Sequence, residues 1–146
     1  MAIPTFERFF RDAAGIHVDK DDLKRYNEFV EHKISDLFMR GVAVAKANDR
    51  DILEPWDCPI TAGLQVTMHE FEKMEEEIEL APILERLAYL PQLEVELSEE
   101  AREQLPLIAG GLSVALARAL QIIDPEAGHP RTADWERAFR LFDLLI

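Results

Sequence analysis

The feature that most constrains this chain is an internal repeat with a period of about 79 residues. Residues 3–10, IPTFERFF, align with residues 81–88, APILERLA, at an offset of 78. Residues 18–22, VDKDD, align with residues 97–101, LSEEA, at an offset of 79, which is also the separation of Trp56 from Trp135. A proline, a helix start and a tryptophan that recur in the same order indicate two copies of one structural unit.

The first copy is predicted to form a short helix, a long helix and a second short helix. A proline near the start of residues 4–13 suits a first helical turn, because its missing N–H would have no partner there. Asp19 is a candidate N-cap for the long helix, which keeps helical apolar spacing for about 28 residues and ends at Asn48. One face of the third helix carries four apolar residues: Ile60, Leu64, Met68 and Phe71.

The second copy repeats this plan less regularly. Ser98 is the candidate N-cap of its long helix, and residues 133–145 are expected to form its last short helix. Pro106 lies inside the long helix and predicts a bend or an irregular start. The pair Gly110 and Gly111 removes side-chain bulk, so we expect the two long helices to cross closely there. Residues 92–98, QLEVELS, alternate weakly and could add one extended stretch beside another loop.

The fold class predicted from these patterns is all-α, in a single domain that spans residues 1–146. Its parts are a first half at residues 3–72, a helical linker at 73–80 and a second half at 81–146. A unit of about 70 residues with one long helix cannot bury its own apolar faces, so the two halves must pack against each other.

Two short helices that flank a long one, repeated once, resemble a pair of histone folds fused in one polypeptide. The first half matches the archaeal-histone plan from Phe6 to Phe71, with loops at residues 15–18 and 50–55. The whole chain is also similar to a small group of bacterial proteins of unknown function that carry two histone folds in tandem. The resemblance covers nearly the whole chain. It implies an intramolecular pseudo-dimer in which Trp56 and Trp135 open the two third helices and anchor equivalent loops.

The resemblance also implies a structural clamp in the first half. In histones an arginine of the second loop pairs with an aspartate seven residues later, and Arg50 and Asp57 have this spacing. Ile52 stands where the family commonly has threonine. In the second half His129 and Glu136 fall at the two clamp positions, so we expect that clamp to be weakened or replaced.

DNA is the ligand that a histone fold suggests, and the charge of this chain disfavours it. The net charge is −13, with 29 acidic residues against 16 Lys and Arg. A field of that sign repels phosphate, whose neutralisation by cations dominates nucleic-acid affinity. At one end of the molecule the resemblance brings together four candidate contacts: His17, Lys20, His129 and Arg131. The other end combines Gln92, Glu94 and Glu96 with residues 49–54 and is acidic. Wrapping of a duplex is therefore not expected.

An enzyme is not indicated either. The four histidines (His17, His32, His69 and His129) share no metal-ligand spacing, and we predict no metal site and no cofactor. Cys58 follows an aspartate and is expected to be a small buried side chain. A single cysteine suits a reducing cytoplasm, and no apolar run long enough to span a membrane is evident. No small-molecule substrate is suggested.

Two hypotheses remain. The first is a protein-interaction module of the dimerisation type, favoured if Phe139, Phe142 and the terminal LLI face solvent. The second is a weak or partial DNA-binding, nucleoid-type protein that uses the mildly basic loop end. A salt-dependent affinity for DNA that is lost in Arg131→Glu would distinguish the second from the first.

Overall fold

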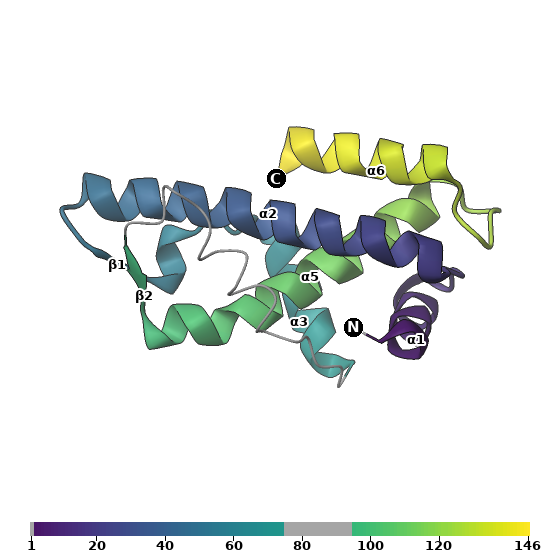
Figure 1. Cartoon of the computed structure of the whole chain (residues 1–146), viewed down its shortest axis with the longest axis horizontal. Helices are drawn as coiled ribbons and strands as arrows, with labels where there is room; N and C mark the ends of the chain where they lie inside the picture. The colour runs from purple at the N-terminus through teal and green to yellow at the C-terminus, as the bar shows by residue number, and fades with distance from the viewer. Residues whose placement is uncertain (1, 75–94) are drawn as a thin grey trace.

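The computed structural model describes residues 2–74 and 95–146 and shows an all-α chain with two very short strands (Figure 1). The predicted linker from residue 75 onward and the predicted first helix of the second half lie outside the described residues. In chain order the described elements are α1 (Ile3–Ala14), α2 (Lys20–Ala47), β1 (Ile52–Leu53), the 3-10 helix η1 (Pro55–Asp57), α3 (Ala62–Lys73), β2 (Glu96–Leu97), α5 (Glu99–Ile123) and α6 (Thr132–Leu145).

The boundaries of the first two helices follow from their capping residues, as the sequence predicts. Helix α1 ends at Gly15, which adopts the left-handed conformation (φ 67°) that a residue without a Cβ tolerates best. Helix α2 begins after Asp19, whose carboxylate accepts the N–H groups of Asp21 and Asp22. The carboxylate of Asp22 accepts the N–H of Asp19 in return and completes a capping box. The 28 residues of α2 therefore start and stop on local signals.

The two long helices α2 and α5 cross, and the short helices cover them (Figure 1). Helices α1 and α3 lie against α5, and α6 lies beside α2. The contact between α2 and α6 is aromatic, because Phe29 stacks on Phe139 with ring centroids 5.4 Å apart and meets Phe142 edge-on at 4.9 Å. The second half of the chain thus supplies most of the surface that buries the first.

The glycine pair in α5 allows close approach of α3, not of the other long helix as the sequence predicts. A Cβ on Gly110 would overlap the ring of Phe71, and one on Gly111 would lie 2.5 Å from the side chain and 3.0 Å from the backbone nitrogen of Met68. Both neighbours belong to α3. The expectation that the two long helices approach closely at these glycines is therefore wrong, and the missing side chains admit the short helix α3 instead.

Helix α5 is continuous from Glu99 to Ile123, and Pro106 lies inside it. The irregular start that the proline predicted is therefore not found. By length and composition alone this helix would suffice to cross a membrane, which the sequence analysis did not expect. More than half of the apolar window is buried in the protein. Because α1, α3 and α6 cover this helix, its hydrophobicity is that of a central core helix.

Each end of the molecule is closed by a pair of loops from opposite halves. At one end β1 and β2 form a parallel pair in which Ile52 is opposite Glu96 and Leu53 is opposite Leu97. The extended stretch predicted within residues 92–98 is confirmed by β2. At the other end His17 donates its N–H to the carbonyl of Gly128 at 2.7 Å. Loops from the two halves thus meet at both ends of the molecule, but only the first end has a pair of hydrogen-bonded β-strands.

The two tryptophans do not occupy equivalent positions, and the expectation that both anchor loops is wrong for Trp56. Trp135 is fully buried in α6, whereas Trp56 is 75% exposed in η1. The structural equivalents are Asp57 and Asp134, each of which accepts the backbone N–H of the residue three positions earlier. In the second half α6 begins at Thr132, so Trp135 lies within the long final helix, whereas Trp56 lies in η1 before α3.

The core is aromatic where the two halves meet. Phe6 and Phe10 of α1 contact Tyr26 of α2, and Phe10 also contacts Trp135 at 6.1 Å between ring centroids. The hydroxyl of Ser113 donates to the carbonyl of Ala109, so the hydroxyl of Tyr26 is left to donate to Ser113 at 2.7 Å. Burial of the tyrosine raises its pKa to about 12, and the phenol therefore stays protonated.

Candidate functional site

The β1 end holds the arginine–aspartate pair that the sequence singled out. Nη1 and Nη2 of Arg50 donate to the two carboxylate oxygens of Asp57 at 2.8 and 2.7 Å in a parallel fork. Nη1 also reaches the carbonyl of Ile52 at 3.2 Å, and the second lone pair of the buried Asp57 accepts the N–H of Glu54. The hydrogen bond from the guanidinium holds the pKa of the Asp57 carboxyl below its usual range. The pair ties the loop of residues 50–54 to η1.

Cys58, directly after this pair, lies 5% exposed at the edge of the core. Burial, with a smaller contribution from the neighbouring Asp57, raises the pKa of its thiol to about 12. A thiol with that pKa is almost entirely protonated at neutral pH and is a poor nucleophile. The side chain therefore serves as a packing group, as the sequence analysis expects.

The opposite loop end brings together the four residues named as candidate DNA contacts. His17 and Lys20 come from the segment between α1 and α2, and His129 and Arg131 come from the segment before α6. The backbone bond from His17 to Gly128 joins the two segments. All four side chains are exposed. Proximity was thus expected from the resemblance and is found, but the electrostatic surroundings differ from those of a phosphate site.

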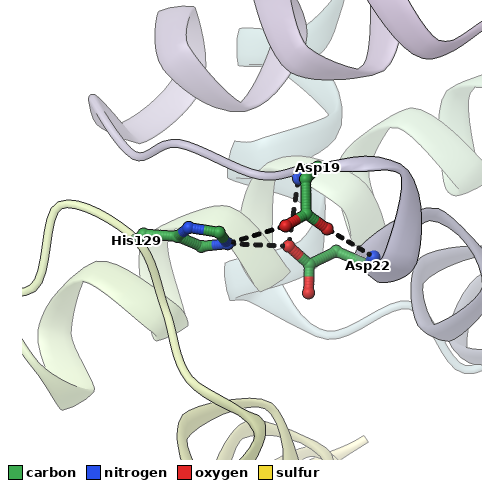
Figure 2. Close-up of side chains that lie close together, drawn as sticks. All are labelled: Asp19, Asp22 and His129. Atoms are coloured by element: carbon green, nitrogen blue, oxygen red, sulfur yellow. Dashed lines mark hydrogen bonds and ion pairs between the residues drawn. The ribbon is translucent and has the colours of Figure 1, made fainter.

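Two of these side chains, His129 and Arg131, face carboxylates of the same protein. Nε2 of His129 lies 3.3 Å from Asp22 and 3.4 Å from Asp19, between the two acids that cap α2 (Figure 2). Arg131 lies 3.6 Å from Asp124 and 3.8 Å from Asp134. A phosphate at this end would have to compete with carboxylates that are already in place.

His129, Asp19 and Asp22 also form the one three-residue group in the described parts of the chain whose ligand atoms lie close enough to hold a cation, all within 4.8 Å. Sequence spacing could not show this group, because the histidine lies 107 residues from Asp22. Both carboxylates already accept backbone N–H groups of the capping box. The arrangement is accounted for as the cap of α2, locked by a histidine from the other half.

The second half does not place its residues at the clamp positions that the sequence analysis assigned. Asp134, not Glu136, takes the place of Asp57, and it is buried while Glu136 is exposed. Arg131, three residues before this aspartate, supplies the nearby guanidinium, and His129 turns to α2 instead. The fixed offset of 79 does not hold here because α5, with 25 residues, is shorter than α2, with 28, so the equivalent aspartates Asp57 and Asp134 lie 77 residues apart. No forked pair forms at this end of the described structure.

A third surface, along α6 and beside the last residue of α5, is apolar. Leu144 is 81% exposed and Leu145 is 72% exposed, and Leu141 and Ile122 also face solvent. A groove of about 400 Å³ there is lined by Ile123, Arg137, Arg140, Leu141 and Leu144. Phe142 is buried, and Phe139 is half-buried against Phe29. Of the residues whose exposure would favour an interaction module, only Leu144 and Leu145 are exposed. We call this surface the α6 face.

The family of the chain follows from comparison with known proteins. A family model described as a domain of unknown function (DUF1931) matches residues 6–143. This chain belongs to the DUF1931 family. Two uncharacterized proteins of Aquifex aeolicus (strain VF5) are 26% identical over 106 residues and 28% identical over 133 residues. These matches cover 73% and 85% of the DUF1931 chain, and the chain spans 62% and 80% of the two relatives.

Solved structures show what fold this DUF1931 protein has. A crystal structure of a protein from Thermus thermophilus superposes with a TM-score of 0.94 at 46% identity, covering 100% of this chain and 99% of that one. A protein from Aquifex aeolicus gives 0.82 at 22% identity over 98% and 94%. The histone from Methanopyrus kandleri gives 0.65 at 18% identity over 92% and 90%. The all-α, histone-like fold predicted from the sequence is confirmed.

Proposed function

We propose that this protein is a non-enzymatic protein-association module that does not wrap DNA, and that its α6 face binds a second copy of the chain. The observation that carries the proposal is the exposure of Leu141 and Leu144, which line the groove with Ile123, and of the next residue in α6, Leu145. Single exposed leucines are ordinary, but a contiguous group around a groove is typical of an interaction surface. A groove along a helix suits the ridge of a helix from another molecule.

The charges around the α6 face favour association there over other surfaces. Two chains with a net charge of −13 repel each other over most of their surface. The groove is lined by Arg137 and Arg140 and by no acid, and neither arginine makes an ion pair within the described residues. The negative potential is therefore weakest where the apolar side chains stand.

The DNA-binding alternative has less support. His129 and Arg131 already face four carboxylates, which leaves Lys20 and His17 of the four candidate contacts at that end. At the β1 end Arg50 is held by Asp57, and three exposed carboxylates (Asp49, Asp51 and Glu96) surround the loop. A duplex path across the molecule would meet net negative charge at both ends.

Sedimentation velocity over a range of protein concentrations tests the association. We expect a monomer–dimer equilibrium that shifts towards dimer as salt is raised, because salt screens the repulsion between like-charged chains and strengthens apolar contacts. Leu144→Glu should abolish the dimer. Val66→Glu, at an exposed apolar residue of α3, is the matched control and should leave it intact. A monomer at every concentration and salt would reject the proposal.

Fluorescence anisotropy with labelled double-stranded DNA tests the alternative in the same buffers. We expect no binding at low salt. Binding that falls steeply as salt rises and is lost in Lys20→Glu/Arg131→Glu would support the DNA-binding reading instead. The two experiments respond to salt in opposite directions, so their outcomes cannot be confused.

A further inference from the structure

The exposed Trp56 stands on the rim of an apolar groove at the β1 end of the molecule. Its side chain is 75% exposed, although tryptophan is among the residues that gain most from burial. The groove beside it has a volume of about 420 Å³ and is lined by Pro55, Trp56, Cys58, Ile60, Gln65, Met68 and Gln104. Ile52, in the strand just before η1, is also exposed. An exposed tryptophan next to an apolar groove is the composition of a binding hot spot.

The exposed charges of the loop before η1 and of β2 are negative. Asp49, Asp51 and Glu96 are exposed and make no side-chain hydrogen bond or ion pair within the described residues. Glu96 lies beside Ile52, since these two residues are paired between β1 and β2. The one arginine of the loop, Arg50, is held in a fork by Asp57 and is not available to balance the three acids.

This combination selects a positively charged partner. Three free carboxylates would repel a phosphate or an acidic peptide, and they would steer and hold a basic one. An indole that stands in solvent offers its face to a guanidinium or an ammonium group. The groove beside the indole accepts an apolar side chain, so the partner should carry apolar residues as well as positive charge.

We propose that the β1 end, formed by Trp56, its groove and the acids at positions 49, 51 and 96, binds a protein segment that alternates arginine or lysine with apolar residues. The apolar side chain enters the groove beside Met68, the cation lies over the indole, and the acids of this end attract the basic segment. The site is separate from the α6 face and does not depend on self-association. Where the histone-like fold would meet phosphate, this end carries the opposite charge preference.

A synthetic peptide tests the proposal directly. The probe is fluorescein-labelled GRLGRLGRLG-amide, titrated with the full chain and followed by fluorescence anisotropy. Two matched peptides replace every arginine by glutamate, or every leucine by serine. We expect the arginine–leucine peptide to bind, the glutamate peptide not to bind, and the serine peptide to bind about tenfold more weakly because it cannot fill the groove.

Variants of the protein show whether this end is the site. Trp56→Ala should weaken binding of the arginine–leucine peptide about tenfold or more, and its exposed position means that the fold is retained. Asp49→Asn/Asp51→Asn should weaken it about fivefold, while asparagine preserves the left-handed backbone of residue 49 (φ 56°). The control Glu126→Gln/Glu136→Gln removes the same charge from exposed positions outside this loop and should change affinity less than about twofold.

Three outcomes would overturn the proposal: no binding of the arginine–leucine peptide, unchanged binding in Trp56→Ala, or equal weakening by the two charge variants. The last would mean that only the net charge of the chain attracts the peptide. Intrinsic fluorescence supplies an independent reading, because Trp135 is buried and only the emission of Trp56 should respond to the peptide. The monomeric variant Leu144→Glu should bind the peptide as the wild type does, which separates this site from the α6 face.

Discussion

Lys33 of α2 is 2% exposed and donates a 2.7 Å hydrogen bond to the carboxylate of Asp143 in α6. The same ammonium lies 3.8 Å from Asp36 and 3.5 Å from the carbonyl of Ile146. This cation therefore joins the middle of the first half to the last turn of the second. The hydrogen bond from Lys33 lowers the pKa of the Asp143 carboxyl.

The two partners of this bond should respond differently to substitution. Asp143→Ala leaves a buried ammonium with weaker partners and should cost about 1 kcal/mol, a small value because the carboxylate is largely exposed and solvent-screened. Lys33→Met fills the same space without a charge and should be close to neutral. Urea unfolding measures both, and a larger loss in Lys33→Met would contradict the argument.

Removal of Arg50 should destabilise the protein more than removal of an ordinary surface arginine. Arg50→Ala leaves the carboxylate of Asp57 buried without its guanidinium, and we expect the Tm to fall by several degrees. Arg50→Lys should recover only part of this, because an ammonium cannot form the fork. Arg102→Ala, in the first turns of α5, is a control for loss of an exposed arginine and should change the Tm little.

The same pair predicts a pH dependence. Because the pKa of Asp57 is lower in the folded protein than in the unfolded chain, its contribution to stability is present above the unfolded value of about 4 and is lost as the pH falls through the folded value. Arg50→Ala should flatten this part of the profile. Urea midpoints measured between neutral pH and acid would show it, and an unchanged slope in the variant would count against the pair as the cause.

Glycine positions in two helices should behave in opposite ways. Gly111→Ala places a methyl group 3.0 Å from a backbone nitrogen of α3 and should destabilise the protein by about 1–3 kcal/mol through overpacking. Gly63→Ala, in the first turn of α3, meets nothing within 4 Å and should be neutral or stabilising by up to about 1 kcal/mol. Thermal unfolding compares the two variants. Equal changes in stability would show that helix propensity alone, and not packing against α3, determines the effect of each substitution.

Cys58 should resist alkylation in the folded state. Its thiol has a raised pKa of about 12 and is buried, so iodoacetamide at mildly alkaline pH should label it slowly, and unfolding in urea should accelerate labelling greatly. Mass spectrometry follows the reaction. Rapid labelling of the native protein would mean that the groove beside Trp56 opens on its own.

What the sequence predicted well depends on local chemistry. The limits of α1 and α2 follow from Gly15 and Asp19, whose effects on the backbone act within one turn. The buried stripe of α2 follows from periodicity alone. Asp57, the partner of Arg50, lies seven residues away in the sequence. This short spacing allowed the pair to be predicted from the resemblance to histones.

What the sequence did not predict depends on register between distant segments. The repeat placed Trp56 and Trp135 together, but the two long helices differ in length by three residues, so the tryptophans do not occupy equivalent positions and only Trp135 is buried. The acids that flank His129 lie in the other half of the chain, so its surroundings could not be predicted from its neighbours in the sequence. A candidate DNA-contact surface was recognised by its cations, and its carboxylates became evident only from the fold.

The pairing of loops from opposite halves has a consequence for synthesis of the chain on the ribosome. His17 bonds to Gly128, and Tyr26 bonds to Ser113, 87 residues later. Helices α1, α2 and α3 therefore leave the exit tunnel with their aromatic faces uncovered and can be covered only when α5 and α6 follow. At about 5–20 residues per second this exposure lasts for seconds, longer than helix formation by many orders of magnitude. A nascent first half is thus the stage at which this protein most needs protection from aggregation.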